Sequence, residues 1–158
     1  MTTKPNPIPD GYHTVTPYLI VNGAAKALDF YQRAFGATEL MRMPGPGGKI
    51  MHAEIRIGNS RVMLNDVMTG KGPKAYGGSP ASLWLYVEDA DALFNRAVRA
   101  GAQVQMPLAD QFWGDRGGAI ADPEGYTWWV ATRKEDLSRA EMEQRAAEAF
   151  KQMASTNR

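Results

Sequence analysis

Apolar and polar positions follow the same plan in two stretches of the chain. Each stretch opens with an apolar run rich in β-branched and aromatic residues, 15–21 and 82–87, which predicts a strand. Apolar residues at three- and four-residue spacing follow and predict a helix, ended by Gly36 in one stretch and Gly101 in the other. The two strands end 66 residues apart and the two glycines lie 65 apart, which indicates an internal repeat with one deletion.

Further strand signals follow each helix, separated by turns rich in glycine and proline. Each repeat therefore predicts a βαβββ module, the first over 14–66 and the second over 82–133, with a linker over 67–81. We expect an α+β fold in which both modules form a single domain, 1–135.

A third helix is expected beyond the modules, in an appendage over 136–158. Ser138 and Glu141 fit a capping box at its start, and Met142, Phe150 and Met153 mark one apolar face. Two interpretations are open. The helix either stabilises its own subunit or is an arm that docks on a second subunit.

Composition excludes several classes of protein. The chain has 158 residues, no cysteine and two histidines, so it has no disulfide framework, no cysteine nucleophile, and only histidines and carboxylates for a transition metal. A net charge of +1 gives no basic surface for nucleic acid. No apolar run is long enough for a membrane span or a signal peptide, so we expect a soluble cytoplasmic protein.

Several short motifs carry a family resemblance. They are Thr16-Pro17-Tyr18-Leu19, Phe30-Tyr31, Phe35-Gly36, the segment 51–58, the segment 111–116, and Asp122-Pro123-Glu124-Gly125-Tyr126 before the last strand. Together with the duplicated βαβββ plan, they resemble the vicinal oxygen chelate superfamily, which contains glyoxalase I, bleomycin and fosfomycin resistance proteins and extradiol dioxygenases. The motifs are most similar to its PhnB-like, glyoxalase/bleomycin-resistance-like subgroup. The resemblance implies strands that curl around a cavity, helices on the outside, and a homodimer.

Metal-using members of this superfamily place ligands on the first and last strands of each module. The resemblance puts these positions at Thr16, Leu64, Ser82 and Trp129. None of the four is a histidine or a carboxylate, the donors that a divalent cation in these enzymes needs. We therefore expect no metal site and no cofactor.

The strand after Gly48 carries the candidate acid–base residues. Strict alternation gives it a face under the helices, with Met51, Ala53, Ile55 and Ile57, and an opposite face with Ile50, His52, Glu54 and Arg56. A histidine beside a carboxylate suits proton transfer near neutral pH, which makes His52 and Glu54 the catalytic candidates. The same pattern also fits an exposed strand face with a Glu–Arg pair. Alternation from Thr16 turns His13 the other way, toward the surface.

The remaining candidates would bind a ligand. Trp113, Asp115 and Arg116 lie in a predicted loop, where Arg116 either holds an anion with Asp115 orienting it, or forms with Asp115 a brace that pins the loop to the sheet. Arg56, on the same strand face as His52 and Glu54, is another ligand candidate. The other candidates lie on the runs expected to line the cavity, and they are Thr16, Tyr18, Ser82, Trp84, Tyr86 and Trp129. A concave aromatic surface with a few polar groups is typical of a small-molecule site, although these rings also suit an ordinary core.

Two functions from different classes are consistent with these residues. The first is a binding protein for a small, partly aromatic or anionic molecule, without the usual metal. The second is a lyase or isomerase that uses His52 and Glu54 as an acid–base pair, with or without a metal held by the same two residues. The ligand itself stays unknown, because a fold does not fix a function.

Overall fold

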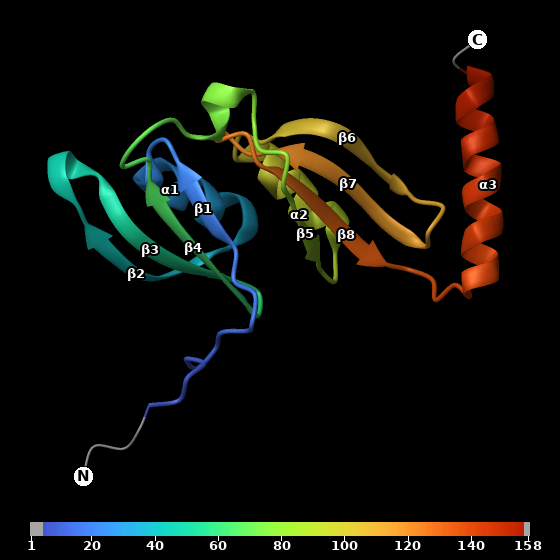
Figure 1. Ribbon diagram of the computed structural model, residues 1–158. Coiled ribbons are helices and arrows are strands. Elements are labelled where there is room, and N and C mark those ends of the chain that lie inside the picture. Colours follow the sequence, from blue (N-terminus) through green and yellow to red (C-terminus); the bar gives the residue numbers. More distant parts are fainter. Residues whose placement is uncertain (1–4, 157–158) are drawn as a thin grey trace.

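The computed structural model describes residues 5–156, which form two four-stranded sheets and three α-helices (Figure 1). The first module contains β1 (Tyr18–Val21), α1 (Ala24–Phe35), β2 (Thr38–Pro44), β3 (Ile50–Ile57) and β4 (Ser60–Asp66). The second contains β5 (Ser82–Tyr86), α2 (Ala90–Arg99), β6 (Gln103–Asp110), β7 (Asp115–Ala121) and β8 (Thr127–Arg133), and α3 (Arg139–Thr156) follows. The α+β class and the two βαβββ modules are confirmed. No helix in this range has the length and hydrophobicity needed to cross a membrane.

The two sheets have the same topology. The strand order is β1-β4-β3-β2 in the first sheet, called sheet 1, and β5-β8-β7-β6 in the second, called sheet 2. Each sheet has one parallel pair, β1–β4 or β5–β8. Tyr18 pairs with Met63, and Trp84 pairs with Trp129, so both members of the first pair lie 66 residues before their counterparts. The prediction that Leu64 matches Trp129 is therefore wrong by one residue. Leu64 is fully buried on the helix side of sheet 1, and Met63 takes the matching position.

Helices α1 and α2 each cover one face of a sheet and meet between the modules (Figure 1). Gly36 ends α1 in the left-handed region at φ 67°, and Asp89 caps α2 by accepting from the Ala92 N–H at 2.9 Å. The Phe35 and Trp128 rings, one from each module, lie 4.7 Å apart between centroids. A single hydrophobic core therefore runs through both modules.

The opposite face of each sheet is open. Tyr18 and Ile20 on sheet 1 are 51% and 44% exposed, and Trp84 and Tyr86 on sheet 2 are 42% and 62% exposed. The two sheets stay separate, and no closed barrel forms in the part of the chain that the structure describes. Large apolar side chains on these faces thus lack a covering layer.

Residues at the start of β3 depart from strict alternation. Ile50 is buried and Met51 is exposed, the reverse of the predicted arrangement. The pairing of β2 with β3 shifts between Met43 and Pro44, and this irregularity turns the strand by one residue. From His52 onward the predicted faces are confirmed by the burial of Ala53, Ile55 and Ile57.

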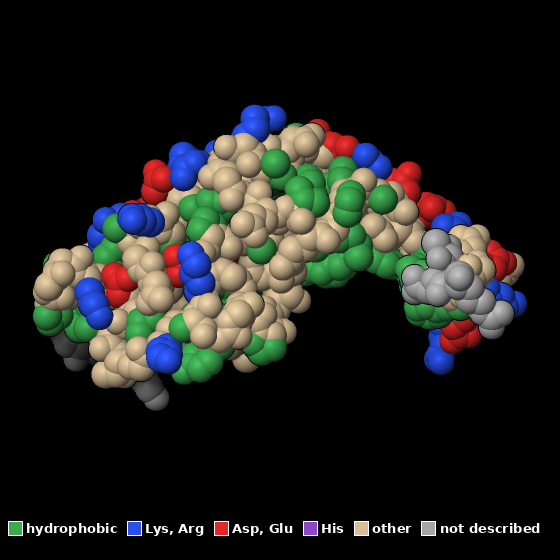
Figure 2. Space-filling model, turned by 90° about the horizontal axis from the view of Figure 1, so that it is seen from above, with side chains coloured by type: hydrophobic (Ala, Val, Ile, Leu, Met, Phe, Trp, Pro, Cys, Tyr) green, Lys and Arg blue, Asp and Glu red, His purple; other side chains and the backbone are tan. Residues whose placement is uncertain are grey.

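Helix α3 begins with the predicted capping box. The Ser138 N–H donates to Glu141 Oε2 at 2.8 Å, and the Glu141 N–H donates to Ser138 Oγ at 3.3 Å. Figure 2 shows α3 standing away from the body of the molecule with a hollow between them. The Phe150 ring lies 6.0 Å from Phe112 in the β6–β7 loop, yet Phe150 is 61% exposed. The C-terminal part of the apolar face of α3, with Phe150 and Met153, is therefore exposed.

Candidate functional site

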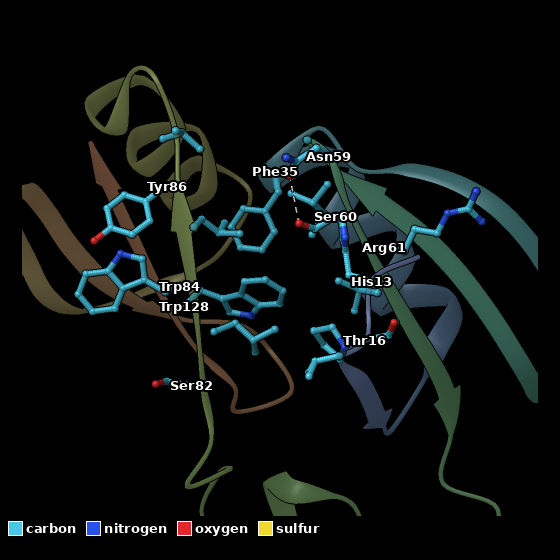
Figure 3. Close-up of a pocket in the computed structure, with 18 of the residues that line it drawn as sticks. His13, Thr16, Phe35, Asn59, Ser60, Arg61, Ser82, Trp84, Tyr86 and Trp128 are labelled. Carbon is cyan, nitrogen blue, oxygen red and sulfur yellow. Dashed lines mark hydrogen bonds between the residues drawn. The ribbon is translucent and has the colours of Figure 1, made fainter. Parts of the chain in front are cut away.

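A cavity of about 750 Å³ lies between the two modules (Figure 3). One wall is β5, and the other consists of the segment before β1 and the turn between β3 and β4. Its apolar lining comes from both modules and includes Phe35, Ile57, Val62, Leu83, Leu85, Leu93 and Trp128. Its polar lining includes His13, Thr16, Asn59, Ser60, Arg61 and Ser82. A cavity of this size and composition can enclose a small organic molecule.

Four of the candidate ligand residues line this cavity, namely Thr16, Ser82, Trp84 and Tyr86. His13 is exposed, as expected, and it also lines the cavity. Alternation could not place His13, because β1 begins only at Tyr18 and the preceding segment is not a strand. The Arg61 side chain is a further cavity residue that the sequence did not single out.

Aromatic rings cluster on the open face of sheet 2, beside the cavity. Trp84 and Trp129 stack with centroids 4.7 Å apart and planes at 6°. Trp113 lies 6.4 Å from Trp84 and 6.1 Å from Trp129. The three indoles, which we call the tryptophan cluster, bring together three candidate ligand residues on one face.

Asp115 holds two side chains at the edges of this cluster. Its Oδ2 accepts from the Tyr86 hydroxyl at 2.9 Å and from Trp113 Nε1 at 3.0 Å. Asp115 is only 4% exposed, and both bonds are partly buried. The bond to Asp115 raises the pKa of Tyr86, because the carboxylate favours the protonated hydroxyl.

Arg116 lies on the other face of sheet 2. The strand β7 already begins at Asp115, so these neighbours alternate across the sheet instead of sharing a loop. Arg116 donates to both carboxylate oxygens of Asp91 on α2, at 2.6 and 2.7 Å, and to Asp110 at 3.2 Å. It ties β7 to α2, and the structure does not bring it together with Asp115 or the cavity.

His52 and Glu54 lie together on the open face of sheet 1. His52 Nε2 is 3.2 Å from Glu54 Oε1, and the Tyr12 hydroxyl donates to Glu54 Oε2. Tyr18 lies beside the pair, with its ring centroid 5.9 Å from that of His52. The Tyr12 bond, together with weaker contributions from His52 and Arg61, lowers the pKa of Glu54. Glu54 is thus suited to orient the His52 ring as a charged carboxylate rather than to accept a proton itself.

The cation nearest Glu54 is Arg61, not Arg56. Arg61 Nη1 lies 3.6 Å from Glu54 Oε2, and its guanidinium sits 4.5 Å from the centroid of the Tyr12 ring. Arg56 is exposed at the far end of β3. Glu54 pairs with Met63 across the β3–β4 hairpin, so the register of that hairpin brings Arg61 close.

The residues at the superfamily's metal positions do not fit a divalent cation. With the register corrected, these positions hold Thr16, Met63, Ser82 and Trp129. Hydroxyls, a thioether and an indole offer neither imidazole nor carboxylate. Residues 5–156 also contain no group of three or more His, Asp or Glu side chains placed to share a metal ion.

The duplicated βαβββ fold and the cavity between its modules define a known class of protein. The chain belongs to the glyoxalase/bleomycin resistance protein/dioxygenase superfamily, whose family model matches residues 12–130. An uncharacterized protein from Mycobacterium bovis is 50% identical over 120 residues, covering 72% of this chain and 79% of the relative.

Solved structures show the same similarity. TioX from Micromonospora sp. ML1 is 30% identical, with a TM-score of 0.63 over 77% of this chain and 98% of that chain. A PhnB protein from Bacillus cereus is 20% identical, with a TM-score of 0.62 over 76% of this chain and 99% of that chain. At 20% identity, the latter similarity extends to the fold alone.

Proposed function

We propose that this protein binds a small organic molecule in the cavity between its modules, without a tightly held metal. The cavity of about 750 Å³ carries the proposal, because it combines an apolar interior with a polar rim. Superfamily membership adds support, since members of this superfamily bind small molecules. The residues at the superfamily's metal positions lack the donors for a divalent cation, which is why the ligand is expected to bind through protein contacts alone.

The rim favours a ligand with an anionic group. Arg61 and His13 are the basic side chains of the lining, while Glu54, the carboxylate nearest Arg61, is 3.6 Å away and already accepts from Tyr12. An anion at the rim would share Arg61, whose guanidinium has donors to spare. The ligand body would contact Leu83, Leu85 and Trp128.

Calorimetric titration with 8-anilinonaphthalene-1-sulfonate, an aromatic anion, tests the proposal. We expect saturable binding of one probe per chain, weakened at least about tenfold by Leu85→Trp, which fills the cavity, and about fivefold by Arg61→Ala. Leu40→Trp on the exposed strand β2 is the matched control and should bind normally. Equal affinity in Leu85→Trp and the wild type would overturn the proposal. A stoichiometric metal, found by elemental analysis of the purified protein, would refute its metal-free part.

A second candidate function is an enzyme that uses the His52–Glu54 pair. The 3.2 Å contact between His52 Nε2 and Glu54 Oε1 favours it, because the carboxylate fixes the orientation of the ring. The reaction would be that of a lyase or isomerase, with His52 moving the proton. Its test is the pH–rate profile of His52→Ala on any substrate found, with Arg56→Ala as the control. An unchanged rate in His52→Ala would exclude this role.

We also propose that the chain forms a homodimer in which a second copy covers the open aromatic face of sheet 2. Support comes from a continuous row of rings, in which Trp84, Trp113, Phe112 and Phe150 each lie within 6.4 Å of the next. This row links the sheet to the exposed apolar side of α3. Light scattering should give the mass of two chains for the wild type and of one chain for Phe150→Asp/Met153→Asp. A one-chain mass for the wild type would refute the dimer.

A further inference from the structure

Ser60 and Tyr126 occupy equivalent positions in the two modules. Each lies three residues before the residue that pairs with Tyr18 or Trp84, which is Met63 in sheet 1 and Trp129 in sheet 2. A hairpin turn precedes each of them, with two residues between Ile57 and Ser60 and three between Asp122 and Tyr126. Ile57 pairs with Ser60, and the Asp122 N–H donates to the Tyr126 carbonyl at 3.0 Å. The repeat therefore offers an internal comparison between these two positions.

Tyr126 closes the free edge of strand β1. The Ile20 N–H donates to the Tyr126 hydroxyl oxygen at 3.2 Å, and that hydroxyl donates to the Ile20 carbonyl at 3.0 Å. Tyr126 is only 7% exposed, so its ring fills the space beside the strand. One phenol thus supplies both the hydrogen-bond partner and the apolar packing that an unpaired edge residue needs.

Within residues 5–156, no side chain closes the matching edge of β5 as Tyr126 closes that of β1. By the same 66-residue offset, Tyr86 matches Ile20 and Ser60 matches Tyr126, and both Tyr86 and Ser60 line the cavity. The Ser60 side chain is too short to reach across the cavity to the main chain of Tyr86. The Ser60 hydroxyl instead donates to Asn59 Oδ1 at 3.2 Å (Figure 3).

The main chain of β5 presents free groups to this space. The Val87 N–H donates to the Ala131 carbonyl of β8 at 2.9 Å. The main-chain N–H and C=O of every second residue before it, Leu85 and Leu83, therefore also point toward β8. Along a parallel strand the direction alternates, which turns the N–H and C=O of Trp84 and Tyr86 toward the free edge. All residues from Ser82 to Val87 line the cavity, so that edge runs along its wall.

We propose that the cavity recognises a phenolic ring, whose hydroxyl pairs with the main-chain N–H and C=O of Tyr86 as Tyr126 pairs with Ile20. The ring would pack among Phe35, Leu85 and Trp128, which line the same space. Because the cavity is much larger than one ring, the phenol is the anchor of a larger molecule. This inference rests on the proposed binding function and names the class of its ligand.

Displacement of 8-anilinonaphthalene-1-sulfonate by 4-methylphenol and by 4-methylanisole tests the anchor. The anisole keeps the ring and an acceptor oxygen but lacks the O–H donor, so it should compete about tenfold more weakly. The Tyr86 amide resonance should shift with 4-methylphenol and stay in place with the anisole. Equal competition, or a Tyr86 amide that does not respond to 4-methylphenol, would overturn the proposal while leaving the binding function intact.

Variants at Ser60 test the same idea both with and without a ligand. Ser60→Tyr should restore the missing partner and abolish 4-methylphenol binding, whereas Leu40→Tyr on the exposed strand β2 should keep it. Ser60→Phe fills the space without a hydroxyl, so Ser60→Tyr should melt about 3 °C above it. A Tm of Ser60→Tyr equal to or below that of Ser60→Phe would refute the edge contact. Failure of the sulfonate to bind would instead refute the proposed function, and the two Tm values would still decide the edge contact.

Discussion

The Tyr31 hydroxyl on α1 donates to Asp122 Oδ2, in the turn before β8, at 2.7 Å. The bond joins the two modules across 91 residues of chain and is buried. Trp128 Nε1 donates to the same oxygen at 2.9 Å. Burial, reinforced by Asp122, raises the pKa of Tyr31 well above its ordinary value, which keeps the hydroxyl protonated as a donor.

Tyr31→Phe should therefore destabilise the protein by about 1–3 kcal/mol, since it leaves a buried carboxylate short of one donor. The denaturant midpoint in urea measures the loss. Tyr76→Phe is the control, because Tyr76 is 74% exposed and should change the midpoint little. A Tyr31→Phe midpoint equal to that of the wild type would show that the bond contributes nothing to joining the modules.

The neighbouring Glu124 should make stability fall as pH rises. Its Oε2 accepts from the Asn22 N–H at 2.7 Å, but burial raises its pKa above the ordinary 4.5. A carboxyl with a raised folded-state pKa supports folding while protonated. That contribution is complete below 4.5 and is lost as pH rises through the folded-state pKa.

Glu124→Gln removes this titration and keeps an acceptor for Asn22. The stability difference between Glu124→Gln and the wild type should therefore shift in favour of the variant from about pH 4 to pH 7. Urea midpoints across that range measure it, and Glu143→Gln on the exposed face of α3 serves as the control. A difference that is constant with pH would contradict the raised pKa.

Much of the fold was predictable because each strand and helix of the repeat is indicated by residues close together in sequence. Strand length, helical spacing and the helix-ending Gly36 and Gly101 are each determined by neighbours in sequence, and the structure confirms the order that they predict. The register of β4 against β1 could not be predicted from neighbouring residues. Leu64 and Met63 are both apolar, and only pairing with Tyr18 decides which of them faces the helices.

The candidate site was less predictable for the same reason. The cavity forms where two modules meet, so His13 and Arg61 reach it through tertiary packing that no periodicity records. The sequence predicts a loop at Asp115 and Arg116 because glycines flank them. Pairing of Asp110 with Arg116 extends the hairpin and places the two side chains on opposite faces.

Tyr12 should control the ionisation of Glu54. The pKa of Glu54 is lowered chiefly by the hydrogen bond from Tyr12, so Tyr12→Phe should raise it toward the ordinary 4.5. A carboxyl with a lowered folded-state pKa stabilises the fold above 4.5 and loses that contribution as pH falls through the folded-state value. Tyr12→Phe should consequently be less stable than the wild type at neutral pH, with the difference shrinking in acid.

The Glu54 carboxyl resonance, followed by NMR over the acid range, reads this pKa directly. Tyr76→Phe again provides a matched control that leaves Glu54 unchanged. The same titration bears on the enzyme hypothesis, because Glu54 is the carboxylate that contacts His52 Nε2 at 3.2 Å. An unmoved Glu54 midpoint in Tyr12→Phe would mean that His52 and Arg61 set its ionisation instead.

Asp115 should set the geometry of the tryptophan cluster. It is 4% exposed and its Oδ2 accepts from both Tyr86 and Trp113, so Asp115→Ala frees two rings at once and removes the acceptor of two hydrogen bonds. We expect a loss of about 1–3 kcal/mol in the free energy of unfolding. We also expect a weaker near-ultraviolet circular dichroism signal, because Trp113 no longer holds its angle to the stacked pair Trp84 and Trp129.

Asp115→Asn distinguishes the effect of the two hydrogen bonds from the effect of the negative charge on Asp115. The amide oxygen can still accept one of the two donors, so this variant should keep part of the dichroism signal. Asp136→Ala controls for loss of an acidic side chain, since Asp136 is largely exposed and pairs only with Arg133 in the described chain. If Asp115→Ala kept the full signal while losing stability, Asp115 would support the hairpin alone, and the orientation of the indoles would come from their own stacking.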